Sequence, residues 1–170
     1  MQIRKTRYDH PDAVLLTAQV QQEYVERYGD PDATPVDVGH FDAPYGRFLL
    51  GYLDGAAVAT GGWRAQDASP DGFEDGDAEL KRMYVVPQAR GKGLARRMLA
   101  ELERDAAAAG RTRMVLETGL MQPEAIALYT SSGYTPVAKF GHYRDSPLSV
   151  CLGKSLLAVG PASATRARPA

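Results

Sequence analysis

Apolar side chains recur at intervals of three and four residues in two long stretches of the chain, which is the spacing of one helix face. The stronger pattern predicts a helix over residues 91–109 that ends at Gly110, a residue type that commonly follows a helix. Its apolar face would carry Leu94, Met98, Leu99, Leu102 and Ala106. A looser pattern predicts a first helix over residues 11–28, which opens with Pro11. A short third helix is expected over residues 123–131.

Runs of alternating apolar and polar positions, rich in β-branched and aromatic side chains, predict strands between these helices. Asp54 and Gly55 form a strong hairpin signal between two of them. The expected strands cover residues 2–6, 48–53, 56–63, 78–86, 113–118, 134–138 and 149–154. The order of elements is βα, then a β-meander, then βαβαββ. This order predicts a mixed sheet with helices on its faces, in the α/β or α+β class.

The length of 170 residues suits one compact domain. We expect this domain to cover residues 1–157, and the small, proline-containing tail 158–170 to be disordered. Residues 29–44 show little periodicity and predict a long loop with room for a short helix. Residues 67–77 are acidic and predict a surface loop.

Charge and cysteine content narrow the classes of function. Lys and Arg total 20 against 21 Asp and Glu, which gives a formal charge of −1. This balance does not predict the basic surface that binds nucleic acid or an acidic membrane. The single Cys151 excludes an internal disulfide and predicts a buried thiol in a reducing compartment. The N-terminus lacks a signal peptide, and no apolar run reaches membrane-spanning length, which favours a cytoplasmic protein. No metal is expected, because none of the three histidines lies at the sequence spacing of metal ligands from another His or Cys.

The most informative segment runs from Met83 to Ala95, where a strand leads through a tight turn into the long helix. Gly91 and Gly93 allow a sharp turn and a close approach of a ligand to the backbone. The first N–H groups of a helix have no partner within the helix, and the helix dipole favours an anion there. Arg90 and Lys92 add positive charge, so the turn suits a pyrophosphate. An ordinary strand-to-helix turn with glycines for tightness is the alternative interpretation.

Three motifs together resemble the GNAT superfamily of N-acetyltransferases. Residues 88–95 (QARGKGLA) match its Gln/Arg-x-x-Gly-x-Gly/Ala signature. Residues 79–87 look like its fourth strand, and residues 125–134 look like its later helix-to-strand motif. The resemblance covers about residues 48–137, with the motifs in the expected order. It implies a mostly antiparallel central sheet of about seven strands in which two central strands splay apart to form a cleft.

The resemblance also implies acetyl-CoA as the donor and assigns residues to it. Backbone amides of residues 88–95 would bind the pyrophosphate, and the strand edge at residues 83–85 would pair with the pantetheine arm like an added strand. Gln122 stands where many members carry Asn and would contact the cofactor with a longer amide. The expected cofactor-binding residues are Met83, Tyr84, Val85, Gln88, Arg90, Gly91, Lys92, Gly93, Leu94, Ala95 and Gln122.

Two residues are candidates for proton transfer. Tyr129 matches a tyrosine that the family often uses as general acid near the sulfur, although a core aromatic would show the same spacing. Glu79 resembles a strand glutamate that some members use as base, and regular alternation would place it on one face with Met83 and Val85. A solvated charge paired with Lys81 or Arg82 is the alternative for Glu79.

The acceptor pocket of the family usually draws on the first helix, the loop after it and the loop between the last strands. Here those segments offer aromatic and acidic side chains that would suit a small cationic amine. The candidates are Tyr24, Tyr28, Asp30, Trp63, Phe140, His142 and Tyr143, each of which could instead belong to the core or to a loop surface.

The resulting hypothesis is an N-acetyltransferase in which a primary amine of a small molecule or peptide attacks acetyl-CoA directly in a ternary complex. A non-catalytic acyl-CoA-binding module and a purely structural domain are the alternatives. A homodimer is compatible with the family, but the sequence pattern does not predict an interface.

Overall fold

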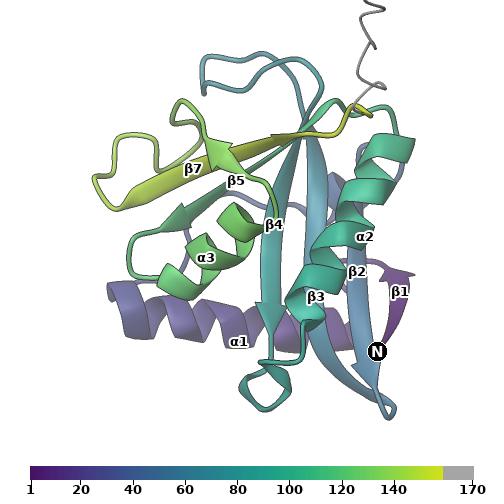
Figure 1. The fold of residues 1–170 in the computed structure, drawn as a ribbon. Coiled ribbons are helices and arrows are strands. Elements are labelled where there is room, and N and C mark those ends of the chain that lie inside the picture. The colour runs from purple at the N-terminus through teal and green to yellow at the C-terminus, as the bar shows by residue number, and fades with distance from the viewer. Residues whose placement is uncertain (159–170) are drawn as a thin grey trace, which may run out of the picture.

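The computed structural model describes residues 1–158 of the chain, which form one seven-stranded sheet and three α-helices (Figure 1). The strand order is β1-β2-β3-β4-β5-β7-β6, and every neighbouring pair is antiparallel except β4 and β5. The strands are β1 (Gln2–Thr6), β2 (Gly46–Leu53), β3 (Ala56–Gln66), β4 (Asp77–Val85), β5 (Arg113–Gly119), β6 (Thr135–Pro136) and β7 (Ser149–Ser155). The helices are α1 (Pro11–Tyr28), α2 (Leu94–Ala108) and α3 (Pro123–Ser131), with short 3-10 turns η1 (Val38–Phe41) and η2 (Pro87–Ala89). The predicted fold class is confirmed.

Alternation along β2 shows how the helices are divided between the two faces of the sheet. Leu49 packs into the core cluster that contains the buried face of α2, whereas Phe48 and Leu50 pack into the cluster that contains the buried face of α1. Tyr129 of α3 belongs to the same cluster as α2. Helices α2 and α3 therefore cover one face of the sheet, and α1 crosses the other (Figure 1).

The helix boundaries follow from their terminal residues. The ring Nδ1 of His10 accepts the Asp12 N–H at the start of α1, and Gly29 ends it with φ 88°, as the sequence predicted. Helix α2 begins at Leu94 instead of residue 91, because Gly91 and Gly93 form the preceding turn with positive φ. Strand β6 is only two residues long, much shorter than the predicted 134–138.

The two central strands part after a short parallel contact. Residues 77–79 of β4 pair with residues 113–115 of β5, and among the described residues the rest of β4 has no partner strand on that side. Figure 1 shows β5 and β7 turning away from β4. The predicted splay of two central strands is therefore present, and residues of both strands line a cleft between them.

A β-bulge in β4 lies beside this opening. Lys81 pairs with Gly62 and Tyr84 with Thr60, so two residues of β4 face one of β3. Arg82 takes φ 59° there, a conformation that costs a non-glycine residue energy and recurs at functional sites. The bulge reverses the alternation: Leu80 lies with the α2 core before it, and Met83 and Val85 lie with that core after it.

Several side chains proposed for the acceptor pocket belong to the core instead. Trp63 is 1% exposed, and its indole Nε1 donates to Asp105 at 2.9 Å. Phe140 is buried against Phe73, Val115 and Cys151, which makes the Cys151 thiol a packed group as predicted. Except for residue 158, the predicted tail lies outside the described residues.

Candidate active site

The turn between β4 and α2 exposes a series of free backbone donors. Gly91 and Gly93 have φ 75° and 71°, and a Cβ built on either would meet no atom within 4 Å. Within residues 1–158, the amides of residues 91–96 have no hydrogen-bond acceptor, because the first bond of the helix is donated by Arg97 to the Gly93 carbonyl. Side chains do not fill the turn, and its free donors at a helix N-terminus suit an anionic group.

The two basic side chains of this turn differ in their availability. Arg90 donates from Nε to the Val85 carbonyl at 2.8 Å, and its guanidinium pairs with Glu23 of α1. It also lies 5.5 Å from the ring centroid of Tyr84. Arg90 therefore fixes the turn against α1. Lys92 is exposed, and no carboxylate within residues 1–158 pairs with it.

The remaining predicted cofactor residues lie around the turn and along the cleft. Gln88 is exposed at the start of the turn, whereas Leu94 is buried in the α2 core with Ala95 packed against the same cluster. Gln122 lies just before α3 and lines the cleft, where its Nε2 donates to the Tyr28 hydroxyl at 3.3 Å.

The cleft between the parted strands has a volume of about 310 Å³. Its walls are residues 80–83 of β4 and 116–119 of β5, with contributions from the loop after α1, from α3 and from the start of β7. Tyr24 and Tyr28 line it from the end of α1, and a side chain at Gly119 would collide with the Tyr28 hydroxyl. Tyr143 lines it from the opposite side, and its hydroxyl accepts the Ala33 N–H at 2.7 Å.

His142, like Trp63 and Phe140, is a predicted acceptor residue that does not line the cleft. Its ring stands edge-on against Tyr143, with the centroids 4.7 Å apart. It therefore supports a residue of the cleft wall without lining the cleft itself.

Tyr129 lines the cleft from α3 with 6% of its surface exposed. Its ring packs edge-on against Tyr134, and within residues 1–158 its hydroxyl has no hydrogen-bond partner. Burial raises the pKa of Tyr129 above its usual value, and Tyr24 adds to this effect, so the side chain is a neutral phenol at physiological pH. A free O–H donor thus faces the cleft.

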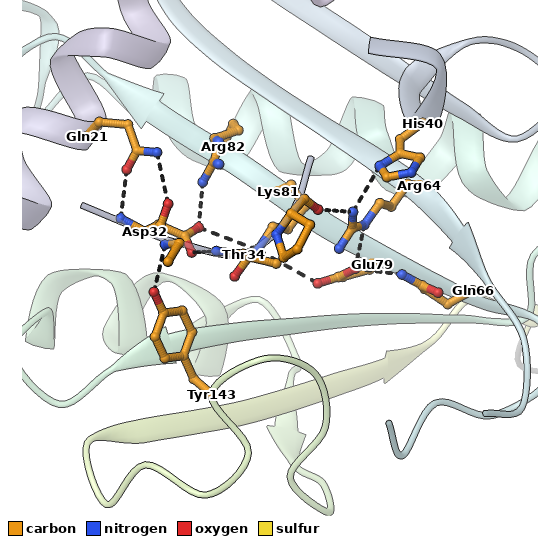
Figure 2. Close-up of polar contacts among 12 residues, drawn as sticks. Gln21, Asp32, Thr34, His40, Arg64, Gln66, Glu79, Lys81, Arg82 and Tyr143 are labelled. Carbon is orange, nitrogen blue, oxygen red and sulfur yellow. Dashed lines mark hydrogen bonds and ion pairs between the residues drawn. The ribbon is translucent and has the colours of Figure 1, made fainter. Parts of the chain in front are cut away.

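Glu79 lies in a buried ion-pair network beside the cleft (Figure 2). Its Oε2 accepts from Arg64 Nε at 2.7 Å and from Gln66 Nε2 at 2.9 Å, and its Oε1 stands 3.7 Å from Lys81 Nζ. It is 3% exposed and is not among the residues that line the cleft. The expectation that Glu79 shares a face with Met83 and Val85 is wrong, because the bulge at Arg82 intervenes.

Sequence reasoning missed Asp32, which anchors the other end of this network. Gln21 of α1 fixes its backbone by two hydrogen bonds, and its carboxylate accepts from Arg82 and from the Thr34 N–H (Figure 2). Burial alone would raise the pKa of Asp32, but Lys81, Thr34 and Arg82 together lower it to about 2. Asp32 is therefore an anion at every physiological pH.

Sequence reasoning also missed Glu117, the carboxyl group on the β5 wall of the cleft. Burial raises the pKa of Glu117 to about 7, against the opposite effects of Lys81 and Ser149. A carboxyl that gains and loses its proton near neutral pH is suited to general base catalysis. The signal available in the sequence was the single acidic residue of this strand, directly after the apolar run Met114–Leu116.

Comparison with known proteins agrees with this geometry. A sequence profile described as the acetyltransferase (GNAT) family matches residues 16–134. The chain belongs to the GNAT acetyltransferase family. It is thus an acyl-CoA-dependent N-acyltransferase, as the resemblance in its motifs implied.

Similar proteins cover most of the chain. An IAA acetyltransferase of Azospirillum brasilense is 38% identical over 85% of this chain and 92% of its own. The uncharacterized N-acetyltransferase YjgM of Escherichia coli is 31% identical over 77% of this chain and 79% of its own. A Klebsiella pneumoniae structure assigned to the acyl-CoA N-acyltransferases superposes with a TM-score of 0.72 at 30% identity, covering 92% of this chain and 97% of its own.

A fourth similar protein shares the fold at lower identity. The structure of yncA from Salmonella typhimurium, solved with its cofactor acetyl-CoA, superposes with a TM-score of 0.61 at 22% identity. The superposition covers 96% of this chain and 99% of that one. The GNAT fold therefore binds acetyl-CoA in a protein of this architecture.

Two further features bear on the class of protein. None of the helices within residues 1–158 is long and apolar enough to cross a membrane. The same residues contain no cluster of three His, Cys, Asp or Glu side chains with the geometry of a metal site.

Proposed function

We propose that this enzyme transfers the acetyl group of acetyl-CoA to a primary amine of a small molecule or peptide, by direct attack in a ternary complex. Residues 1–157 would form the single acyltransferase domain. The observation that carries the proposal is the opening between β4 and β5, with an unpaired β4 edge on one wall and the free amides of residues 91–96 at its end. We further propose that it works in the cytoplasm, where a reducing environment keeps Cys151 as a thiol.

The chain's own groups would hold the cofactor at three places. The amides of residues 91–96, with the charge of Lys92, would bind the pyrophosphate. The edge of β4 at residues 83–85, where the Val85 carbonyl already accepts from Arg90 Nε, would donate and accept further hydrogen bonds along the pantetheine arm, as an added strand does. Gln122 would contribute its side-chain amide from the cleft wall. When bound, acetyl-CoA supplies a thioester-activated acetyl group.

Two residues of the cleft would move the protons. An ammonium group must lose a proton before its nitrogen can attack, and Glu117 can take that proton near neutral pH. The nitrogen bonds to the acetyl carbon while the carbon–sulfur bond breaks, and the electron pair leaves with the sulfur. Tyr129 would protonate the sulfur, and the proton then lost by the new amide nitrogen would restore the phenol. Glu117 would release the first proton to solvent.

Glu117 replaces Glu79 in this proposal because of their surroundings. The Oε2 of Glu79 already accepts from Arg64 and Gln66, whereas the carboxyl of Glu117 lines the cleft and titrates near neutral pH. The role of Glu79 as base stays a prediction, and the substitution Glu79→Gln tests it beside Glu117→Gln.

A thiol-release screen tests the proposed activity. The purified protein with acetyl-CoA should release CoA thiol in the presence of one class among amino acids, polyamines, aminoglycosides and peptide N-termini. Mass spectrometry of the product should show a gain of one acetyl group on the amine. Binding of acetyl-CoA without release of thiol by any amine would select a non-catalytic binding module and contradict the proposal.

Tyr129→Phe should lower kcat about 100-fold or more, because it removes the proton donor for the leaving sulfur and keeps the buried ring. The dissociation constant for acetyl-CoA should change less than about threefold, since binding energy comes mainly from the backbone contacts. Stopped-flow kinetics and isothermal titration calorimetry measure the two quantities.

Tyr134→Phe is the matched control for this substitution. It also removes a phenol oxygen from a buried ring, but this hydroxyl donates to Glu103 at 2.9 Å, outside the cleft lining. Its kcat should stay within about twofold of wild type. Equal kcat values for the two variants would remove Tyr129 from the chemistry.

A further inference from the structure

The Lys81 side chain is buried in the cleft wall without a hydrogen bond of its own. Only 7% of it is exposed, and its Nζ stands 3.6 Å from Asp32 and 3.7 Å from Glu79, beyond hydrogen-bond distance. Within residues 1–158 none of its three N–H donors has an acceptor. An ammonium group in such a mostly buried position gains free energy when a hydrogen-bond acceptor completes it. Lys81 Nζ is not among the fully buried polar atoms that lack a partner within residues 1–158, so it stays accessible from the cleft. Since Lys81 lines the cleft, the missing acceptor can come from a ligand.

The buried ion-pair network beside the cleft contains two carboxylates and three basic side chains. Lys81 is the basic side chain left without a carboxylate of its own. Asp32 is matched by the guanidinium of Arg82, and Glu79 is matched by the guanidinium of Arg64 (Figure 2). Lys81 lies between these two pairs, and no third carboxylate of residues 1–158 forms an ion pair with it. The β4 wall of the cleft therefore carries one positive charge that its own contacts do not neutralise.

Glu117 faces this charge across the cleft, because it lines the β5 wall and Lys81 lines the β4 wall. When Glu117 takes a proton from the acceptor amine, it becomes neutral and no longer offsets the charge of Lys81. The protein then holds one unbalanced buried cation in the state in which the amine attacks. An acceptor that brings its own carboxylate restores the balance, whereas a simple amine does not.

We propose that the acceptor is a free amino acid, whose carboxylate binds the ammonium of Lys81 while its amine faces Glu117. This inference rests on the proposed function and names its substrate class. Lys81 and Glu117 stand on the two walls of one cleft, so a molecule with both a carboxylate and an amine can reach both side chains. A free amino acid differs from the small cationic amine that the aromatic residues alone suggested. It also differs from a peptide N-terminus, in which the carboxylate next to the amine has been converted into a peptide bond.

Matched pairs of acceptors test the inference. Several amino acids, each beside its carboxamide and its decarboxylated amine, are compared by thiol release with acetyl-CoA at a fixed pH. The value of kcat/KM for the acid should exceed that for its carboxamide about 10- to 100-fold, the worth of a hydrogen-bonded charge pair. The amine of a carboxamide loses its proton more easily, so its intrinsic reactivity works against the expected preference.

Lys81→Gln should bring this acid-to-amide ratio close to one, whereas the control Lys5→Gln should leave it unchanged. Lys5 is 60% exposed and pairs with Asp105, away from the cleft. The ratio is taken within one enzyme, so a partly unfolded Lys81→Gln preparation cannot produce or hide the effect.

Three results separate this inference from the proposed function. Equal rates with acids and carboxamides, or a preference that survives Lys81→Gln, would overturn the amino-acid assignment while the acetyltransferase activity stands. Acetylation of peptide N-termini or polyamines in preference to amino acids would do the same. Failure of every amine to be acetylated would remove the proposed function itself, and this inference with it.

Discussion

Gly91→Glu is expected to abolish the stabilisation that acetyl-CoA gives to the wild-type protein against thermal unfolding. At a concentration of 100 times the dissociation constant, a ligand adds about 2.7 kcal/mol to the free energy of unfolding. For a chain of this size that corresponds to a rise in melting temperature of roughly 5–11 °C. The new side chain would project into the open space beside Gly91 and place a carboxylate near the free amides of residues 91–96. Differential scanning fluorimetry with and without acetyl-CoA measures the shift.

Gly55→Glu is the matched control, because it imposes the same backbone cost and adds the same charge elsewhere. Gly55 has φ 82° in the β2–β3 hairpin, and a Cβ there meets no atom within 4 Å, as at Gly91. Both variants should lose about 1 kcal/mol of stability without ligand. Only Gly55→Glu should keep the full shift with acetyl-CoA. An undiminished shift in Gly91→Glu would mean that the pyrophosphate binds elsewhere.

Local signals explain why the helices and this turn could be predicted from the sequence. The apolar spacing of α2, the hairpin signal at Asp54 and Gly55, and the glycines at 91 and 93 each act over a few neighbouring residues. Their effect on the backbone does not depend on the rest of the fold. The same is true of the open turn itself, since positive φ at two glycines and an uncapped helix start are properties of that segment.

The chemistry of the cleft could not be predicted in this way, because it depends on segments far apart in the sequence. Asp32, Lys81 and Glu117 meet only after β4 and β5 have paired for three residues and parted. Alternation along β4 placed Glu79 on the wrong face, since a bulge with Arg82 at φ 59° depends on pairing with β3. The sequence therefore predicted the open turn at residues 88–95 but not the face of the sheet on which Glu79 lies.

Glu117→Gln should lower kcat/KM about 100- to 10,000-fold at pH 7.5, the usual effect of losing a general base. In the wild type, kcat/KM should rise with pH through about 7 as Glu117 ionises, and this rise should be absent from the variant. The charged and titratable groups around Glu117 are Lys81, Glu79, Asp32, Tyr24, Tyr143 and Cys151. Burial raises the pKa of the Cys151 thiol, which keeps it protonated near pH 7. Asp32 has a pKa of about 2 and the pKa values of both tyrosines are raised, so these three do not titrate near pH 7.

Glu79→Gln separates the two candidate bases. If Glu117 is the base, Glu79→Gln weakens the pair with Arg64 and lowers stability but keeps the rise of kcat/KM near pH 7. Loss of that rise in Glu79→Gln and its persistence in Glu117→Gln would restore Glu79 to the role expected from the sequence. Initial-rate profiles from pH 5.5 to 9, with the same acceptor for all three proteins, distinguish the outcomes.

The pH dependence of stability provides a second test of Glu117. The substitution that lowers kcat/KM is expected to make the folded protein more stable above neutral pH. The folded protein raises the pKa of Glu117 from 4.5 to about 7, so it holds this proton more tightly than the unfolded chain does. Ionised Glu117 therefore costs the folded state up to about 3 kcal/mol above pH 7 and nothing below pH 4.5. Glu117→Gln removes this cost, so the variant should unfold at a higher urea concentration than wild type at pH 8 and at a similar one at pH 4.5. A variant that is slower and yet more stable at pH 8 is expected of a carboxyl group kept in the cleft for catalysis. A variant that is less stable at pH 8 would instead mean that ionised Glu117 holds the cleft together.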